Sequence, residues 1–126
     1  MEFDKALNEE SHPLNEMARI GEYQPFIVYV YGKEGPVPHF HLIKGSPDTP
    51  SWQTCIRIDA SEYFHHTGKE EVLNSGERKE LVEFLKQPNK YIASITNWQY
   101  LVAQWSSNNP SWEIAPEIAM PNYSVL

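Results

Sequence analysis

The feature that most constrains the fold of this chain is the run Phe26–Tyr31, in which every residue is β-branched or aromatic. Residues of this kind favour strands, and the segment Gly32–Pro36 that follows has the glycine and proline content of a turn. Apolar residues return at Val37. The pattern therefore predicts two strands joined as a hairpin, with a loop of about five residues between them.

The middle of the chain predicts a third strand and then a helix. The segment Thr54–Asp59 alternates polar with apolar side chains, as a half-buried antiparallel strand does. Asn74 is followed three residues later by Glu77, which is the spacing of a capping box at a helix N-terminus. This helix ends at Pro88, and its apolar residues with helical spacing are Leu81, Val82, Phe84 and Leu85.

A second helix is predicted from Ser94 to about Ser107, because its large apolar residues fall on one face. Those residues are Trp98, Leu101, Val102 and Trp105. The predicted elements together indicate an α+β fold. We expect a small antiparallel sheet of three to four strands with two helices packed on one face.

The chain is expected to form one domain with an extension at each end. The predicted divisions are an N-terminal arm at 1–21, an α+β domain at 22–107 and a C-terminal tail at 108–126. Within the arm, the apolar spacing between Leu14 and Ala18 predicts about two helical turns. The tail is expected to pack on the domain through Trp112 and Ile114.

The composition is that of a folded protein of ordinary size. Of its 126 residues, 40% are hydrophobic and 13% are aromatic, so the chain can bury a core without a structural metal or disulfide. Its single cysteine, Cys55, excludes an intramolecular disulfide, and no charged and then apolar leader is evident at the amino end. We therefore expect a cytoplasmic location, and we expect any bound metal to be functional.

The net charge of −7, with a pI near 5.1, opposes the electrostatic attraction by which proteins bind nucleic acid. Nucleic acid is therefore an unexpected partner. No apolar run approaches the length of a membrane span, and no lipidation signature is present. A protein partner remains open on these grounds, as does the oligomeric state.

His39 and His41 are the residues best suited to carry chemistry. They stand two apart in the predicted strand Val37–Ile43, so their side chains project from the same face, about 6.5 Å apart. Two neutral imidazoles on one face form half of a metal centre, of a phosphodiester-cleaving nuclease or of an acid/base pair. The plainer alternative places one ring in solvent and the other at the edge of the core. We expect a surface patch, with Tyr31 and Arg57 beside it as ligand-binding side chains.

A metal centre would need a third ligand, and His65 is the residue expected to supply it. His66, Asp59 and Glu62 are the alternatives. Because His65 and His66 are adjacent, they face opposite sides of an extended chain, and only one of them can join the pair. The cofactor is left open, with Zn²⁺ and Mn²⁺ as the candidate metals.

From Phe26 to about Leu85, the order of features resembles the DUF4160 family, which consists of small bacterial domains of unassigned activity. The shared features are an aromatic strand, the motif Pro38-His39-Phe40-His41, a following strand at Cys55–Asp59 and a helix with an acidic first turn at Glu77. The resemblance implies a small α+β fold and a partner of the toxin–antitoxin-like kind.

The segment Val37–Ile43 also resembles the strand with two histidines around a hydrophobic residue in HUH endonucleases. In those proteins the two histidines hold a divalent metal that polarises the scissile phosphate, and a tyrosine on a later helix is the nucleophile. Tyr91 and Tyr100 are the residues that this resemblance would place in the role of the nucleophile.

Two functions of different classes follow from these observations. The first is a protein-interaction or ligand-binding module, which would recognise a protein partner or an anionic ligand through His39 and His41. The alternative is a metal-dependent phosphodiesterase of the HUH type, whose catalytic candidates are His39, His41, Tyr91 and Tyr100. The sequence leaves the substrate and the identity of any partner open.

Overall fold

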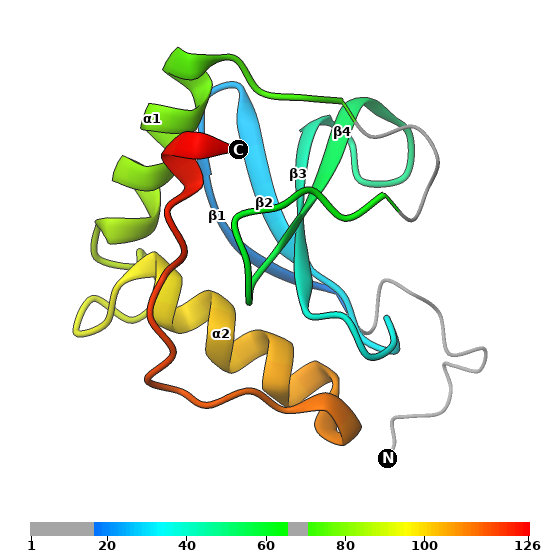
Figure 1. The fold of residues 1–126 in the computed structure, drawn as a ribbon, viewed down its shortest axis with the longest axis vertical. Helices are drawn as coiled ribbons and strands as arrows, with labels where there is room; N and C mark the ends of the chain where they lie inside the picture. The colour runs from blue at the N-terminus through cyan, green and yellow to red at the C-terminus, as the bar shows by residue number, and fades with distance from the viewer. Residues whose placement is uncertain (1–16, 66–70) are drawn as a thin grey trace.

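The computed structural model describes residues 17–65 and 71–126 (Figure 1). Its strands are β1 (Ala18–Tyr23), β2 (Phe26–Val30), β3 (His39–Gly45) and β4 (Pro50–Arg57). The α-helices are α1 (Ser75–Lys86) and α2 (Asn97–Asn108), and two 3-10 turns follow, η2 (Pro110–Trp112) and η3 (Tyr123–Val125). The predicted α+β fold, with a small antiparallel sheet and two helices, is therefore confirmed.

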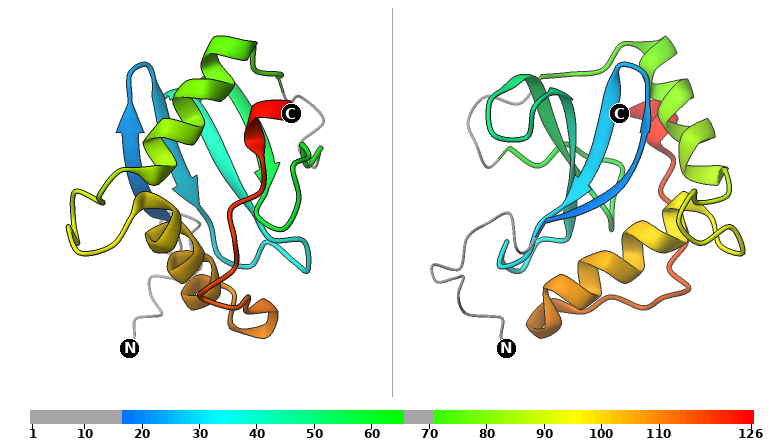
Figure 2. Two further views of the ribbon diagram at one scale, coloured as in Figure 1. Left: turned by 60° about the vertical axis from the view of Figure 1, so that its left-hand side comes forward. Right: turned by 180° about the vertical axis from the view of Figure 1, so that it is seen from behind.

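The sheet is an antiparallel meander in the order β1-β2-β3-β4, so neighbours in the sequence are neighbours in space. The register places Tyr29 of β2 and Cys55 of β4 on either side of His41. Beyond Arg57 the chain turns back, and the amide of Phe64 donates to the carbonyl of Cys55 at 2.8 Å. Both helices lie on one side of the sheet (Figure 2).

The core lies between the helices and one face of the sheet. Alternate residues of the strands point into it, as the two-residue period of a strand requires. The fully or almost fully buried strand residues of this cluster are Ile20, Phe26, Val28, Val30, Phe40, Leu42 and Ile56, and their helix partners are Leu81, Phe84, Leu85, Trp98, Leu101, Val102 and Trp105. Each of these helix residues was predicted from helical spacing to lie on an apolar face.

The C-terminal tail packs on the domain through Tyr123. This side chain is fully buried, its ring meets Phe40 edge-on at 5.8 Å, and its hydroxyl donates to the carbonyl of Arg57 at 2.5 Å. The predicted contact Ile114 does pack against the core, but the Trp112 side chain is 47% exposed. The prediction for Trp112 is therefore wrong, and it is the Trp112 carbonyl that makes contact, by accepting from the indole of Trp105 at 2.9 Å.

Both helices begin at capping boxes. The box at Asn74 confirms the predicted start of α1. The second box, at Thr96 and Gln99, starts α2 at Asn97 rather than at the predicted Ser94. In the described part of the chain, no helix has both the length and the apolar content needed to cross a membrane.

Strand β1 was missed by the sequence analysis, which assigned residues 18–21 to the arm. Ala18, expected in a helical turn, lies in this strand, whereas Leu14 lies outside the described residues. The signal for the strand is weakened by Gly21, which follows a shift in the register with β2 between Arg19 and Gly21. Gly21 is needed because a Cβ there would stand 2.9 Å from the ring of Phe84, a core residue.

Replacing Gly21 with alanine is therefore expected to destabilise the fold. The added methyl group would press on the Phe84 ring, and over-packing of this kind typically costs about 1–3 kcal/mol of unfolding free energy. Urea unfolding followed by tryptophan fluorescence measures the change. Gly76→Ala in the first turn of α1 is the matched control, since its Cβ would meet only an ordinary contact of 3.5 Å. Equal stability of Gly21→Ala and the parent would contradict the assigned role of Gly21.

Candidate metal centre

Strand β3 places His39 and His41 on one face, as predicted. Phe40 between them points into the core, so the two imidazoles must project to the other side of the strand. Their ring centroids are 5.3 Å apart. The packing of Phe40 thus fixes the side of the strand from which the two rings project.

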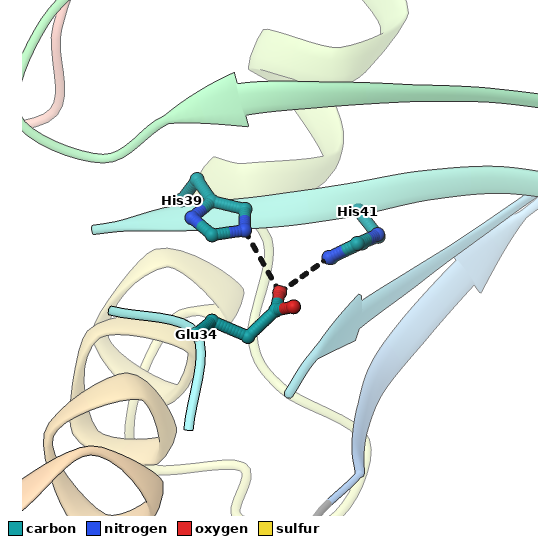
Figure 3. Close-up of side chains that lie close together, drawn as sticks. All are labelled: Glu34, His39 and His41. Atoms are coloured by element: carbon teal, nitrogen blue, oxygen red, sulfur yellow. Dashed lines mark hydrogen bonds and ion pairs between the residues drawn. The ribbon is translucent and has the colours of Figure 1, made fainter. Parts of the chain in front are cut away.

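The third member of the site is Glu34, from the loop between β2 and β3. Its Oε1 atom lies 2.8 Å from Nε2 of His39 and 2.7 Å from Nε2 of His41. Figure 3 shows both rings pointing at this single oxygen. The candidate ligand atoms of the three residues all lie within 4.8 Å of one another. We call this group the Glu34 centre.

Glu34 was not among the ligands expected from the sequence. It stands in the turn-rich segment Gly32–Pro36, where a carboxylate is usually solvated. The backbone folds back over β3 there, with positive φ at Lys33 (58°) and Gly35 (83°) on either side of Glu34. The one available signal was proximity, since Glu34 precedes His39 by only five residues in a hairpin loop.

The hydrogen bonds fix the tautomer of His39. Its Nδ1 lies 2.7 Å from the carbonyl oxygen of Val37, which only accepts, so Nδ1 must carry a hydrogen. A neutral ring then presents a lone pair at Nε2, directly facing the carboxylate oxygen of Glu34. Two acceptors cannot bond to each other. The His39–Glu34 contact therefore requires a cation, which is either a proton on Nε2 or a metal ion.

His41 is held by a neighbour on β4. Its Nδ1 lies 3.4 Å from the sulfur of Cys55, the residue opposite it in the sheet register. A thiol can donate to this nitrogen or accept from it. The Cys55 thiol therefore accommodates either tautomer of His41.

The Glu34 centre is buried, so the expectation of a surface patch is wrong. His39 is fully buried and His41 is 4% exposed, while the Glu34 side chain is 18% exposed. Burial alone would raise the pKa of Glu34, but hydrogen bonds and positive charge from His39 and His41 outweigh it and lower that pKa well below its usual range. The carboxylate is therefore ionised under all ordinary conditions.

Tyr31, predicted as a ligand-binding residue, lies against the centre. Its ring packs on the ring of His41 with centroids 4.5 Å apart. Burial, followed by the influence of Tyr29 and Glu34, raises the pKa of Tyr31 to about 12. A phenol with this pKa stays protonated at neutral pH, so Tyr31 forms a wall of the site rather than a nucleophile.

The other predicted residues lie apart from the Glu34 centre. Arg57 pairs with His39 across the sheet. Its guanidinium, however, bonds to the carboxylate of Asp59 at 2.8 and 3.0 Å. His65 is exposed, and its ring lies 6.2 Å from that of Tyr63. Among the described residues, the third member of the group that could hold a metal is Glu34, whereas the sequence predicted His65. His66 lies outside the described residues.

The two tyrosines expected as nucleophiles pair with each other. Tyr91, in the loop before α2, is 52% exposed, and its ring lies 5.9 Å from that of Tyr100 on α2. Tyr100 lies near the N-terminal end of α2, whereas the loop of Glu34 meets Asn109 at the other end of that helix. The aromatic rings that contact His39 include those of Phe64, at 4.6 Å, and Trp105, at 5.5 Å.

Comparison of the chain with protein family models, with curated proteins and with solved structures finds no match. The resemblances to the DUF4160 family and to HUH endonucleases therefore stay predictions.

The lowered pKa of Glu34 has a measurable consequence in metal-free protein. The carboxyl ¹³C signal of Glu34 is expected to stay at its ionised position as the pH falls from 6 to about 3, well past the ordinary value of 4.5. NMR titration measures this, with a blocked glutamate in the same tube as reference. Because the folded pKa is depressed, the stability that ionised Glu34 contributes is present above about pH 4.5 and is lost as the pH falls through the folded pKa. An inflection near the ordinary value would show that the two histidines do not hold the carboxylate.

Proposed function

We propose that this chain is a metal-binding domain that holds a divalent ion through Glu34, His39 and His41. Two imidazole nitrogens and one carboxylate are a ligand set used for catalytic zinc and for other first-row metals. Zn²⁺ and Mn²⁺ are the candidate ions. Among the described residues the centre has three ligands, and a site with three protein ligands keeps a coordination position for water or a ligand, as functional metal sites do.

The observation that carries this proposal is the contact between His39 and Glu34. The Nδ1 hydrogen of His39 is committed to the Val37 carbonyl, so the contact of its Nε2 with Glu34 needs a cation between the two atoms. A proton meets this need in metal-free protein, and a divalent ion bonded to both atoms would take its place. Metal-binding histidines commonly donate their second nitrogen to a carbonyl or carboxylate in this way, which orients the ring and strengthens it as a ligand.

The spacing of the ligand atoms also supports the proposal. Metal–ligand bonds of about 2.0–2.1 Å place adjacent ligand atoms about 3.3 Å apart in a tetrahedral site. The two Nε2–Oε1 separations are 2.8 and 2.7 Å, so small shifts would admit an ion. The rings are held from behind by Val37 and Cys55. A preformed site of this kind loses little entropy on binding an ion.

What the bound ion does is proposed on chemical grounds. A metal of this class lowers the pKa of a bound water and polarises phosphoryl or carbonyl oxygens, which supports hydrolysis. A metal-assisted phosphodiesterase is the enzymatic form of the proposal. Its nucleophile would be water, because Tyr91 and Tyr100 pair near the N-terminal end of α2, away from the Glu34 loop, and Tyr31 holds its proton.

The protein-interaction hypothesis stays a prediction that depends on the resemblance to DUF4160 domains and their toxin–antitoxin-like partners. In the described residues, the large exposed apolar side chains are Val72, Tyr91, Ile92, Trp112 and Val125, of which Tyr91 and Ile92 are adjacent in the sequence. A few exposed apolar residues are normal on folded proteins, so these residues do not favour an interaction surface.

The test of the proposed function is metal binding by the purified chain. Metal-free protein is expected to bind one Zn²⁺ or Mn²⁺ ion per chain and to melt at a higher temperature in its presence, because an ion that binds only the folded state stabilises it by about 2.7 kcal/mol at one hundred times Kd. Isothermal titration and thermal melting measure the two effects. Glu34→Gln keeps the shape of the side chain but weakens a ligand, so it is expected to lower the affinity at least tenfold.

His65→Ala is the control for this experiment, because His65 is the third ligand that the sequence predicted and it lies outside the Glu34 centre. It is expected to leave the affinity unchanged. If the parent chain binds neither ion, the three residues serve only as a charged hydrogen-bond network that ties the loop to the sheet. If His65→Ala abolishes binding while Glu34→Gln does not, the ion sits elsewhere.

A further inference from the structure

We infer that Asn109, which bonds to the backbone of Glu34 and not to its carboxylate, is the residue that positions Glu34 for metal binding. This inference rests on the proposed function. Asn109 stands at the C-terminus of α2, and its side chain reaches the loop that carries Glu34, 75 residues earlier in the sequence. The residue is 2% exposed.

The need for such a residue follows from where the three ligands come from. His39 and His41 are fixed by the hydrogen bonds of β3 to its neighbours, but Glu34 belongs to no regular element. The backbone around it is held in an uncommon conformation, since Lys33 has φ of 58°. A residue with a side chain adopts positive φ only where the surroundings enforce it. Something outside the loop must therefore supply the restraint.

Asn109 supplies that restraint through both ends of its amide group. Its Oδ1 accepts the backbone N–H of Glu34 at 3.0 Å, and its Nδ2 donates to the carbonyl of Tyr31 at 2.9 Å. Nδ2 also donates to the carbonyl of Trp105 at 3.0 Å. The orientation of the amide is dictated by its partners, because a backbone N–H only donates and a carbonyl only accepts. The side chain therefore bridges the loop to the end of α2.

Asn109 is itself held firmly. Its backbone N–H donates to the carbonyl of Trp105 at 2.9 Å, and its own carbonyl accepts from the amide of Trp112 at 2.9 Å. The end of the helix thus restrains the loop at two points, Tyr31 and Glu34. Tyr31 packs on the ring of His41, so the same amide also helps to place the aromatic wall of the site. Partners of this kind, one step removed from the ligands, typically change metal affinity about 10–100-fold when they are removed.

The test compares Zn²⁺ binding by the full chain and by Asn109→Ala. The variant is expected to fold and to bind Zn²⁺ about 10–100-fold more weakly, because the Glu34 carboxylate is no longer held toward the two imidazoles. Asn97→Ala is the matched control. Asn97 is also a buried asparagine, 4% exposed, and its amide donates to the carbonyl of Phe84 at 2.7 Å, within the core and away from the centre. The control is expected to melt at a lower temperature but to keep the parent affinity for Zn²⁺.

Two further measurements separate positioning from a general loss of stability. If Asn109 acts only through Glu34, the double variant Glu34→Gln, Asn109→Ala should bind Zn²⁺ no more weakly than Glu34→Gln alone, to within about twofold. The absorption spectrum of bound Co²⁺ should change in Asn109→Ala as it does in Glu34→Gln, because both lose the carboxylate ligand. If Asn109→Ala does not fold, Asn109→Asp takes its place, since a carboxylate keeps the acceptor for Glu34 but cannot donate to Tyr31.

The outcomes distinguish this inference from the function on which it rests. If the parent chain binds no metal, the proposed function fails. If the parent binds Zn²⁺ and Glu34→Gln loses it, but Asn109→Ala keeps the parent affinity, then only the positioning role is overturned. Additive losses in the double variant, or an equal loss of affinity in Asn97→Ala, would also overturn it.

Discussion

The arrangement of the site depends on one interaction, in which two imidazole rings share a single carboxylate oxygen of Glu34. That oxygen joins the loop between β2 and β3 to the strand that carries both histidines. Through His41 and Cys55 the connection extends to β4. A buried carboxylate is costly unless it is paired and hydrogen-bonded, and here positive groups offset the cost. The bonds from the two rings to Glu34 hold the loop against the strand. The bond to His39 also needs a cation, either a proton or a metal ion, between the ring nitrogen and the carboxylate oxygen.

The two-residue period of β3 separates packing from chemistry. Phe40 and Leu42 point into the core and are fully buried, while His39 and His41 alternate with them along the strand and turn their rings toward Glu34. Because Phe40 is held by the core and by Tyr123 of the tail, the histidines are carried by a rigid element. Ligands on a strand keep their geometry better than ligands on a loop. The tail, which is far from the centre in the sequence, thus contributes to its precision.

The limits of what the sequence predicts follow from the range of the interactions. The common face of His39 and His41 was predictable, because the alternation of a strand is a local property. The start of α1 was predictable for the same reason, since a capping box spans three residues. Strand β1 was missed because a glycine such as Gly21 usually interrupts a strand. The reason for a glycine there is the ring of Phe84, which is distant in the sequence and leaves no room for a Cβ. Glu34 was missed because the loop that places it is held by Asn109, which no local pattern links to it.

The three ligands differ in how they can respond to an ion. The two histidines are buried and fixed by the sheet, whereas Glu34 is the member of the centre with appreciable exposure, at 18%. If the centre binds a metal as proposed, an ion that enters or leaves has to displace the carboxylate first, because moving either ring would break the packing around it. The hydrogen bonds that hold the loop would then govern both the affinity for the ion and its rate of exchange. Asn109, at the end of α2, makes two of these bonds, to Tyr31 and to Glu34.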